Sequence, residues 1–131
     1  MIFLLDSSLP PRLAQALQLF DQEDCQYRHC TEVFGAGAHD EAMLAGVRER
    51  GWFLVTHDVR LSRQPAQRQA LLESGIGVFV FTGLAERTVR EFAAFVLECA
   101  GAMAYQAAKT KAPFIWGISD HRRFTRLDKS R

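Results

Sequence analysis

The chain has 131 residues, which is enough for one compact domain and too few for two ordinary ones. Hydrophobic residues make up 48% and charged residues 24% of the composition, which excludes a disordered or collagen-like chain. The formal net charge of +1 is unevenly divided: residues 1–108 carry 9 Lys and Arg against 13 Asp and Glu, and residues 109–131 carry 7 against 2. We therefore expect one domain over residues 1–131, with an acidic core over about 1–108 and a basic C-terminal extension over about 109–131.

The N-terminal apolar run resembles neither a signal peptide nor a membrane anchor. It reaches Asp6 after four apolar residues and has no basic segment before it. The other apolar stretches are far shorter than the ~20 residues of a membrane span. The three cysteines, Cys25, Cys30 and Cys99, are an odd number without zinc-ligand spacing. These features predict reduced thiols, a cytoplasmic protein and no membrane partner.

Short apolar runs alternate with helical patterns in the first part of the chain. The run 2–5 predicts a strand that is buried on both faces. The apolar spacing over 11–21 predicts an amphipathic helix, with Ser8 as a candidate N-cap. Weak alternation over 25–30 predicts a second strand. A helix is expected over 39–51, because Asp40 and Glu41 near its start complement the helix dipole.

The same alternation continues to the end of the chain. Strands are expected at 52–55 and 78–81, helices at 64–73 and 85–107, and two short final strands at 114–118 and 124–127. Strands that alternate with helices form right-handed βαβ units. The expected fold class is therefore α/β: a three-layer α/β/α sandwich with a mostly parallel central sheet and a short C-terminal β extension.

Acidic residues follow two of the predicted strands. Asp6 ends the first, Asp58 comes two residues after the strand at 52–55, and Asp40 or Glu41 begins the helix that leads into that strand. All should lie at the carboxyl edge of the sheet, where ligands bind in such folds. Oxygen ligands without His or Cys favour Mg²⁺ or Mn²⁺, which can activate a water against a phosphodiester. Each acid alone also fits a helix cap, strand end or turn.

The segments that carry these acids resemble a known family. The run Phe3–Leu13, the Asp40-Glu41 pair before a helix, and the segment 54–68 with its Thr-His-Asp resemble the compact PIN-like domains of VapC-type toxins. The similarity continues through 75–83 and 112–115. It implies an α/β/α nuclease fold, a divalent-metal ribonuclease activity on RNA, and an antitoxin protein that blocks the site.

Carried onto this sequence, the resemblance gives each matching residue a role. Asp6, Asp40 and Asp58 would be the catalytic acids and would hold Mg²⁺ or Mn²⁺. Thr56 would orient Asp58 through a hydrogen bond. Ser8 stands where many relatives have Asn, so it would position a water or a phosphate if it is not a plain N-cap.

The acidic set is smaller than in longer PIN domains. Those domains have a further mid-chain Glu and often a fourth acid after the last core strand, where this chain has Thr82-Gly83. The resemblance therefore leaves open whether one or two metal ions bind.

Basic residues supply candidate RNA contacts. Arg60 and Arg63 lie just beyond Asp58, and arginine makes bidentate contacts with phosphate, although a solvated loop arginine explains them as well. The basic extension also contains Phe114, Trp116 and Phe124. That composition suits RNA or an acidic antitoxin, and packing of the three aromatics on the sheet is the alternative.

Two other functions fit part of the sequence. Asp58, Thr82 and Lys111 imitate the acceptor, hydroxyl and lysine of a receiver-like phosphoacceptor module, which also needs two adjacent acids after its first strand; here Asp6 is followed by Ser7. A degenerate PIN-like fold that binds RNA or a protein without cleavage is the second alternative. The preferred prediction is a metal-dependent endoribonuclease, the toxin of a type II toxin–antitoxin pair, with RNA, an antitoxin and a second copy of the chain as candidate partners.

Overall fold

The computed structural model describes residues 1–21, 24–37, 40–83 and 87–128, with the side chain of Asp40 excepted. The strands are β1 (Ile2–Leu5), β2 (Gln26–His29), β3 (Phe53–Thr56), β4 (Gly77–Phe81), β5 (Phe114–Ile118) and β6 (Phe124–Arg126). The helices are α1 (Pro11–Phe20), α2 (Cys30–Phe34), α3 (Asp40–Arg50), α4 (Arg60–Arg63), α5 (Pro65–Glu73) and α6 (Val89–Lys109). Within the described ranges, no helix is both long and apolar enough to cross a membrane.

All six strands belong to one sheet, in the order β2-β1-β3-β4-β5-β6. Every neighbouring pair is parallel except β5 and β6, which are antiparallel. From β1 the chain goes outward to β2 and then crosses back to place β3 on the other side of β1. The strand order therefore reverses between β1 and β3, which is where ligands bind in open α/β sheets.

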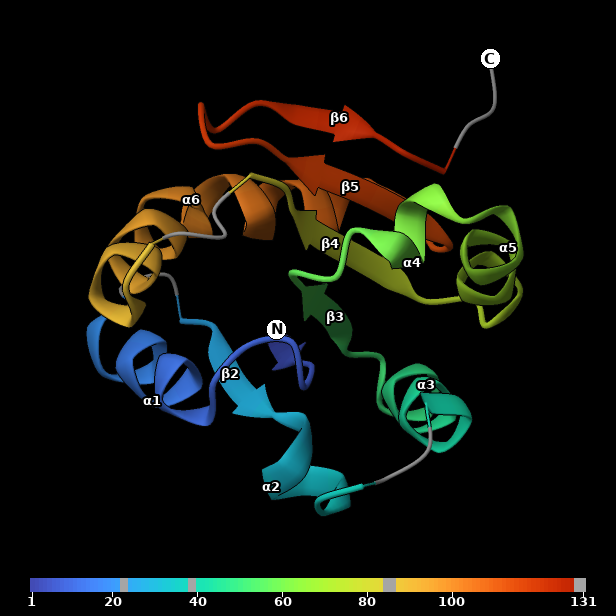
Figure 1. Cartoon of the computed structure of the whole chain (residues 1–131), viewed down its shortest axis with the longest axis horizontal. Helices are drawn as coiled ribbons and strands as arrows, with labels where there is room; N and C mark the ends of the chain where they lie inside the picture. The colour runs from blue at the N-terminus through green and yellow to red at the C-terminus, as the bar shows by residue number, and fades with distance from the viewer. Residues whose placement is uncertain (22–23, 38–39, 84–86, 129–131) are drawn as a thin grey trace.

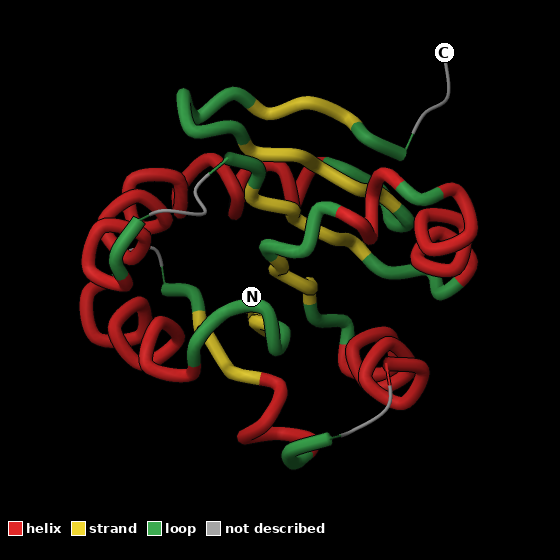
Figure 2. Tube along the Cα trace, in the orientation of Figure 1, coloured by secondary structure: helices red, strands yellow, loops and turns green. Residues whose placement is uncertain are grey.

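Helices cover both faces of the sheet, so the predicted α/β/α sandwich is confirmed. In Figure 1, α1 and α6 lie to the left of the sheet and α3 and α5 to the right, and Figure 2 shows the strands as the middle layer. Alternate residues of each strand enter separate cores: Phe3 and Leu5 face α1 and α6, whereas Leu4 packs with Val47 of α3. Burial on both faces explains why these strands are continuous apolar runs.

Two short helices were missed by the sequence pattern, and one cap was misassigned. Neither α2 nor α4 was predicted, because helices of five and four residues are too short to show an apolar period. The N-cap of α1 is Pro10, not Ser8, and it makes no side-chain cap hydrogen bond. Proline has a backbone conformation suited to the start of a helix, so α1 begins without a side-chain cap. The hydroxyl of Ser8 instead contacts Asp6.

Some boundaries also moved. The helix expected from 85 begins at Val89, where Thr88 and Glu91 form a capping box; 85 itself lies outside the described residues. Likewise α3 begins at Asp40, next to His39, which is also outside them. The strand expected at 52–55 is shifted by one residue and includes Thr56.

The basic extension continues the sheet. Parallel β5 pairs along its whole length with β4 and is an interior strand, and antiparallel β6 forms the edge. Phe114 is fully buried, and the rings of Trp116 and Phe124 pack edge to face with centroids 6.2 Å apart. These aromatic side chains therefore pack on the sheet, which was the alternative to a role in RNA stacking.

Candidate functional site

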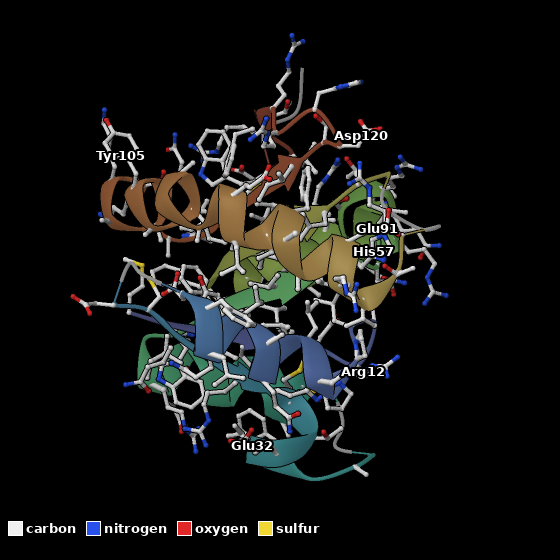
Figure 3. All side chains as sticks on the ribbon, turned by 90° about the vertical axis from the view of Figure 1, so that its left-hand side faces the viewer. Arg12, Glu32, His57, Glu91, Tyr105 and Asp120 are labelled. Carbon is white, nitrogen blue, oxygen red and sulfur yellow. The ribbon has the colours of Figure 1, made fainter. Side chains whose placement is uncertain are left out.

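The ends of β1 and β3 form a crevice at the carboxyl edge of the sheet. The two strands are adjacent, and the backbone N–H of Asp6 extends their ladder by donating to the carbonyl of Val55 at 3.0 Å. After β1 the chain turns to α1 on one face, and after β3 it turns to α4 and α5 on the other. Figure 3 shows His57, which follows β3, and Asp120, which follows β5, at this same end of the molecule.

Asp6 is a buried carboxylate at the centre of this crevice. Only 7% of the residue is exposed. Its Oδ1 accepts a hydrogen bond from the backbone N–H of Ser8 at 2.9 Å and another from the Ser8 hydroxyl. Burial raises the pKa of Asp6, the hydrogen bonds from Ser8 and Thr56 oppose this, and the nearby charge of Asp58 raises it further. Asp6 and Asp58 are therefore close enough to sense each other's charge.

Ser8 joins the loop after β1 to the loop after β3. Its hydroxyl donates to Asp6, accepts from the backbone N–H of His57 at 2.9 Å, and lies 3.2 Å from Oγ1 of Thr56. Because the only Ser8 hydroxyl proton points to Asp6, Thr56 is the donor in that last contact. Thr56 thus donates to Ser8 and Ser8 donates to Asp6, so this chain of hydroxyl groups favours the charged form of the Asp6 carboxylate.

Thr56 positions Asp58 through the backbone. The Thr56 side chain is fully buried, and its Oγ1 accepts the Asp58 N–H at 3.0 Å. This fixes the turn after β3 and so the place from which the Asp58 side chain begins. The contact between Thr56 and Asp58 is therefore to the backbone of Asp58, and the carboxylate itself is held by another group.

That group is Arg60. Its Nε donates to Oδ1 of Asp58 at 2.9 Å and its Nη2 to Oδ2 at 2.8 Å. These hydrogen bonds lower the pKa of Asp58. The Arg60 side chain is 69% exposed, so separating this surface pair costs little free energy. In the structure Arg60 neutralises an acid of the site, and the two contacts with Asp58 use two of the five N–H donors of its guanidinium.

The other predicted acids are not all in the crevice. Asp40 is the first residue of α3, and its side chain lies outside the described part of the structure. Glu41 is exposed and lines a separate hollow between α3 and α5 with Arg48 and Glu73. Among the described residues, no group of three or more His, Cys, Asp or Glu side chains is arranged to hold a metal ion. The described part of the site therefore contains two converging carboxylates.

A cavity of about 440 Å³ opens beside these two acids. Its polar wall includes Asp6, Ser8, Asp58 and Arg60. The opposite wall comes from α2, α3 and the loop between them, and includes Cys30, Thr31, Phe34, Gly35, Gly37, Met43 and Leu44. Sequence reasoning missed this wall because it missed α2. In the structure His29 fixes the start of α2: its Nδ1 accepts the Thr31 N–H at 3.2 Å, and its Nε2 contacts the Leu9 carbonyl at 2.6 Å. Neither contact can be read from the sequence.

The donor chemistry of the crevice fits a hard divalent cation. Asp6 and Asp58 offer carboxylate oxygens, which suit Mg²⁺ or Mn²⁺, and the sulfur-containing residues of the cavity, Cys30 and Met43, belong to α2 and α3 on the opposite wall. A cation bound at Asp58 would compete with Arg60 for the carboxylate, so that one positive partner could replace another. Asp120 belongs to a different place: β5 is three strands from β1, about 14 Å away at the usual strand spacing.

The topology of the sheet is inconsistent with the receiver-like alternative. Lys111 lies just before β5, at the amino edge of the sheet, whereas Asp58 follows the parallel β3 at the carboxyl edge. The lysine and the acceptor aspartate are therefore at opposite ends of the strands. The Thr82 hydroxyl donates to the carbonyl of Ile118 at 3.3 Å, so it binds the neighbouring strand.

Comparison with known proteins gives one family. The model of the PIN like domain matches residues 1–83, which is more than half of the 131 residues and runs from β1 through β4. Neither the curated proteins nor the solved structures give a significant match. The matched region contains Asp6, Asp40 and Asp58, and the fold around it is the α/β/α sandwich described above. The chain therefore belongs to the PIN-like domain family.

Proposed function

We propose that this PIN-like domain is an endoribonuclease that uses Mg²⁺ or Mn²⁺ held by Asp6, Asp58 and Asp40. The observation that carries the proposal is the buried carboxylate of Asp6 beside Asp58 at the point where the strand order reverses. Among the described residues no cationic side chain forms an ion pair with Asp6. A buried carboxylate without such a pair destabilises a fold, so a carboxylate of this kind that lines a cavity favours a functional explanation.

In this proposal Asp6, Asp58 and Arg60 would have separate roles. Asp6 is fixed by Ser8 and would present its free edge to the ion, and Asp58 would exchange Arg60 for it. The released guanidinium would then face the scissile phosphate, to which it can donate two hydrogen bonds. A bound divalent ion supplies an activated water and stabilises the leaving oxygen.

The biological role in the proposal is that of a toxin in a type II toxin–antitoxin pair, acting in the cytoplasm. It is supported by the similarity of the Asp6 and Asp58 segments to VapC-type toxins. An antitoxin that covers the cavity would be the protein partner, and a second copy of the chain is a further candidate partner. A neighbouring small gene whose product suppresses toxicity of the chain would test this role.

The reaction is tested by incubating end-labelled RNA with the purified protein in Mg²⁺, in Mn²⁺ and in EDTA. We expect cleavage only with a divalent ion. Asp6→Asn should lower the rate more than about 100-fold, since loss of a ligand should cost at least as much as loss of its supporting group. Asp120→Asn is the matched control, because it removes the same charge at the same edge of the sheet, three strands away. Cleavage that persists in EDTA or in Asp6→Asn would contradict the proposal.

The Arg60–Asp58 pair favours one alternative, a PIN-like domain that binds RNA without cutting it. With both Asp58 oxygens occupied by Arg60 and Thr82 in place of a fourth acid, the acidic set is small. This alternative predicts RNA binding with no cleavage in either metal. For Arg60→Ala, this alternative predicts that RNA cleavage is still absent. The nuclease proposal predicts that the same variant binds the metal ion more tightly, because Arg60 no longer competes for Asp58.

A further inference from the structure

A second hollow lies on the other side of α4 from the acidic cavity. It has a volume of about 650 Å³ and is bounded by α4 and α5 on one side and by the β5–β6 hairpin on the other, which lie next to each other in Figure 1. We call it the arginine groove; the residues that line it are Ser62, Arg63, Arg68, Thr82, Gly117, Ser119, Arg123, Thr125, Arg126 and Leu127. Four are arginines, four carry hydroxyls, and none is acidic.

Most of the positive charge in the arginine groove is unbalanced. Arg126 is paired with Asp128, at 2.8 Å or less for both nitrogen–oxygen contacts. Within the described residues, Arg63, Arg68 and Arg123 form no ion pair with a carboxylate. Three like charges that border one groove repel one another, and a bound anion would relieve that repulsion.

The hairpin turn assigns neighbouring arginines to opposite sides. Arg122 has a positive φ of 61° and donates to Glu98 of α6 at 3.0 Å, so it is used to fasten the turn. Arg123 is the next residue and borders the arginine groove. Its backbone is held in both directions by Ser119, which donates to its carbonyl at 3.0 Å and accepts its N–H at 3.2 Å. The position of Arg123 is therefore built into the turn.

A single helical turn separates the arginine groove from the acidic cavity. Arg60 and Leu61 of α4 line the cavity, whereas Ser62 and Arg63 line the groove. Four helical residues span about 6 Å. That length corresponds to roughly two nucleotides of a strand at 3.4 Å each. A chain of phosphates whose scissile bond lay at Asp6 and Asp58 would thus reach the groove with its neighbouring nucleotides.

We propose that the arginine groove binds the phosphate backbone of the RNA strand that flanks the scissile bond; this rests on the proposed nuclease function. Arginine forks and hydroxyl donors are the groups that hold phosphates in nucleic-acid complexes. A protein partner would instead need buried aromatic or aliphatic anchors, and among the lining residues only Leu127 has a large apolar side chain. The groove therefore fits a polyanion better than a protein surface.

The test measures RNA binding in EDTA, where no cleavage occurs. The probe is a fluorescein-labelled single-stranded RNA, and its anisotropy gives Kd at several salt concentrations. We expect the double variant Arg63→Ala, Arg123→Ala to raise Kd about 10-fold or more. Its log Kd should also depend less steeply on log salt, by about 1.4 for two lost single-strand phosphate contacts. The matched control is Arg12→Ala, Arg90→Ala, two exposed arginines on α1 and α6, which should change neither quantity.

The outcomes separate this inference from the nuclease proposal. If the groove variant matches the wild type in Kd and salt dependence, or if the wild type binds no RNA, the inference is overturned even where Asp6→Asn abolishes cleavage. If the groove variant loses binding while the wild type cuts nothing in either metal, the inference stands and the nuclease proposal fails. Binding of polyglutamate that depends on Arg63 and Arg123, with RNA binding unaffected, would assign the groove to an acidic protein partner and also overturn the inference.

Discussion

At the scale of single residues, the burial of Asp6 affects the stability of the fold. Burial raises its pKa above the ordinary 3.8, so the folded protein holds the Asp6 proton more tightly than the unfolded chain does. The stability that goes with the protonated form is fully present below pH 3.8 and is lost as the pH rises through the folded-state pKa. At neutral pH the charged Asp6 therefore opposes folding.

It follows that Asp6→Asn should make the fold more stable at pH 7 while it removes activity. An asparagine keeps an oxygen for the Ser8 N–H and carries no charge, so we expect a gain of about 0.5–2 kcal/mol in the free energy of unfolding. The gain should disappear below pH 3.8, where Asp6 is protonated in both states. Urea titrations of both proteins at pH 7 and pH 3.5 measure this. A less stable variant at pH 7 would show that the charge of Asp6 supports the fold.

The Ser8 hydroxyl is the second residue-scale prediction. Ser8→Ala removes its contacts with Asp6, Thr56 and the His57 N–H, so we expect a loss of about 1 kcal/mol in unfolding free energy. It also removes the hydroxyl that holds the Asp6 carboxylate in place, so binding of Mn²⁺ should weaken. Ser7→Ala, next in the chain and exposed, is the control. Equal Mn²⁺ affinity in both variants would argue against a supporting role for Ser8.

At the scale of elements, long apolar periods were predictable and short helices were not. The strands at Ile2–Leu5 and Gly77–Phe81 are buried on both faces, and a continuous apolar run is the direct trace of that burial. By contrast, α2 is fixed by His29, which caps the helix and also contacts the carbonyl of Leu9, twenty residues earlier. Long-range contacts of this kind leave no periodic pattern in a sequence.

The candidate site was predictable to the same extent. Asp6 and Asp58 could be brought together from the sequence because the direction of parallel strands fixes which ends meet. The pairing of Asp58 with Arg60 depends on the turn of α4, and the arginine groove depends on the approach of β6 to α4. Neither relation follows from strand order, so the roles of Arg60 and Arg123 needed the structure.

A glycine in β4 tests the packing of side chains from neighbouring strands on one face of the sheet. A Cβ on Gly77 would overlap the ring of Phe114 and lie 2.9 Å from the ring of Phe53, both packed in the core on the α1–α6 face. We expect Gly77→Ala to lower the free energy of unfolding by about 1–3 kcal/mol. Gly101→Ala, at an exposed position inside α6, should act in the opposite direction, by up to about 1 kcal/mol. Urea unfolding measures both, and a neutral Gly77→Ala would contradict the packing described here.

At the scale of the whole molecule, the last strands are required by the sheet, although the family match ends before them. The match stops at residue 83, yet β4 pairs with β5 along its length. Phe114 and Ile115 of β5 are fully buried and enter the two different cores. The family region alone would therefore expose one edge of a five-residue buried strand.

Removal of residues 112–131 should accordingly abolish cooperative folding. The shortened chain would leave the backbone of β4 unpaired on one side and both cores incomplete. We expect aggregation, or an unfolding transition too broad to fit two states, in circular dichroism during urea titration. A sharp transition like that of the full chain would show that β5 and β6 are an appendage.

Charge is also unevenly distributed at this scale. Acidic side chains of the crevice and basic side chains of the arginine groove lie on the two sides of α4, so opposite charges are separated by one helical turn. If the proposed cation and RNA bind, this separation would place the cation beside the phosphates. It is hidden in the total charge and in the composition.

The central claim is that Asp6 and Asp58 hold a divalent cation, and binding of Mn²⁺ followed by electron paramagnetic resonance tests it most directly. The signal of free Mn²⁺ is titrated with the wild type, Asp6→Asn and Asp120→Asn at neutral pH. We predict that the wild type and Asp120→Asn bind Mn²⁺ with equal affinity and that Asp6→Asn binds it at least about 10-fold more weakly. Equal binding by all three proteins, or none by the wild type, would contradict the claim.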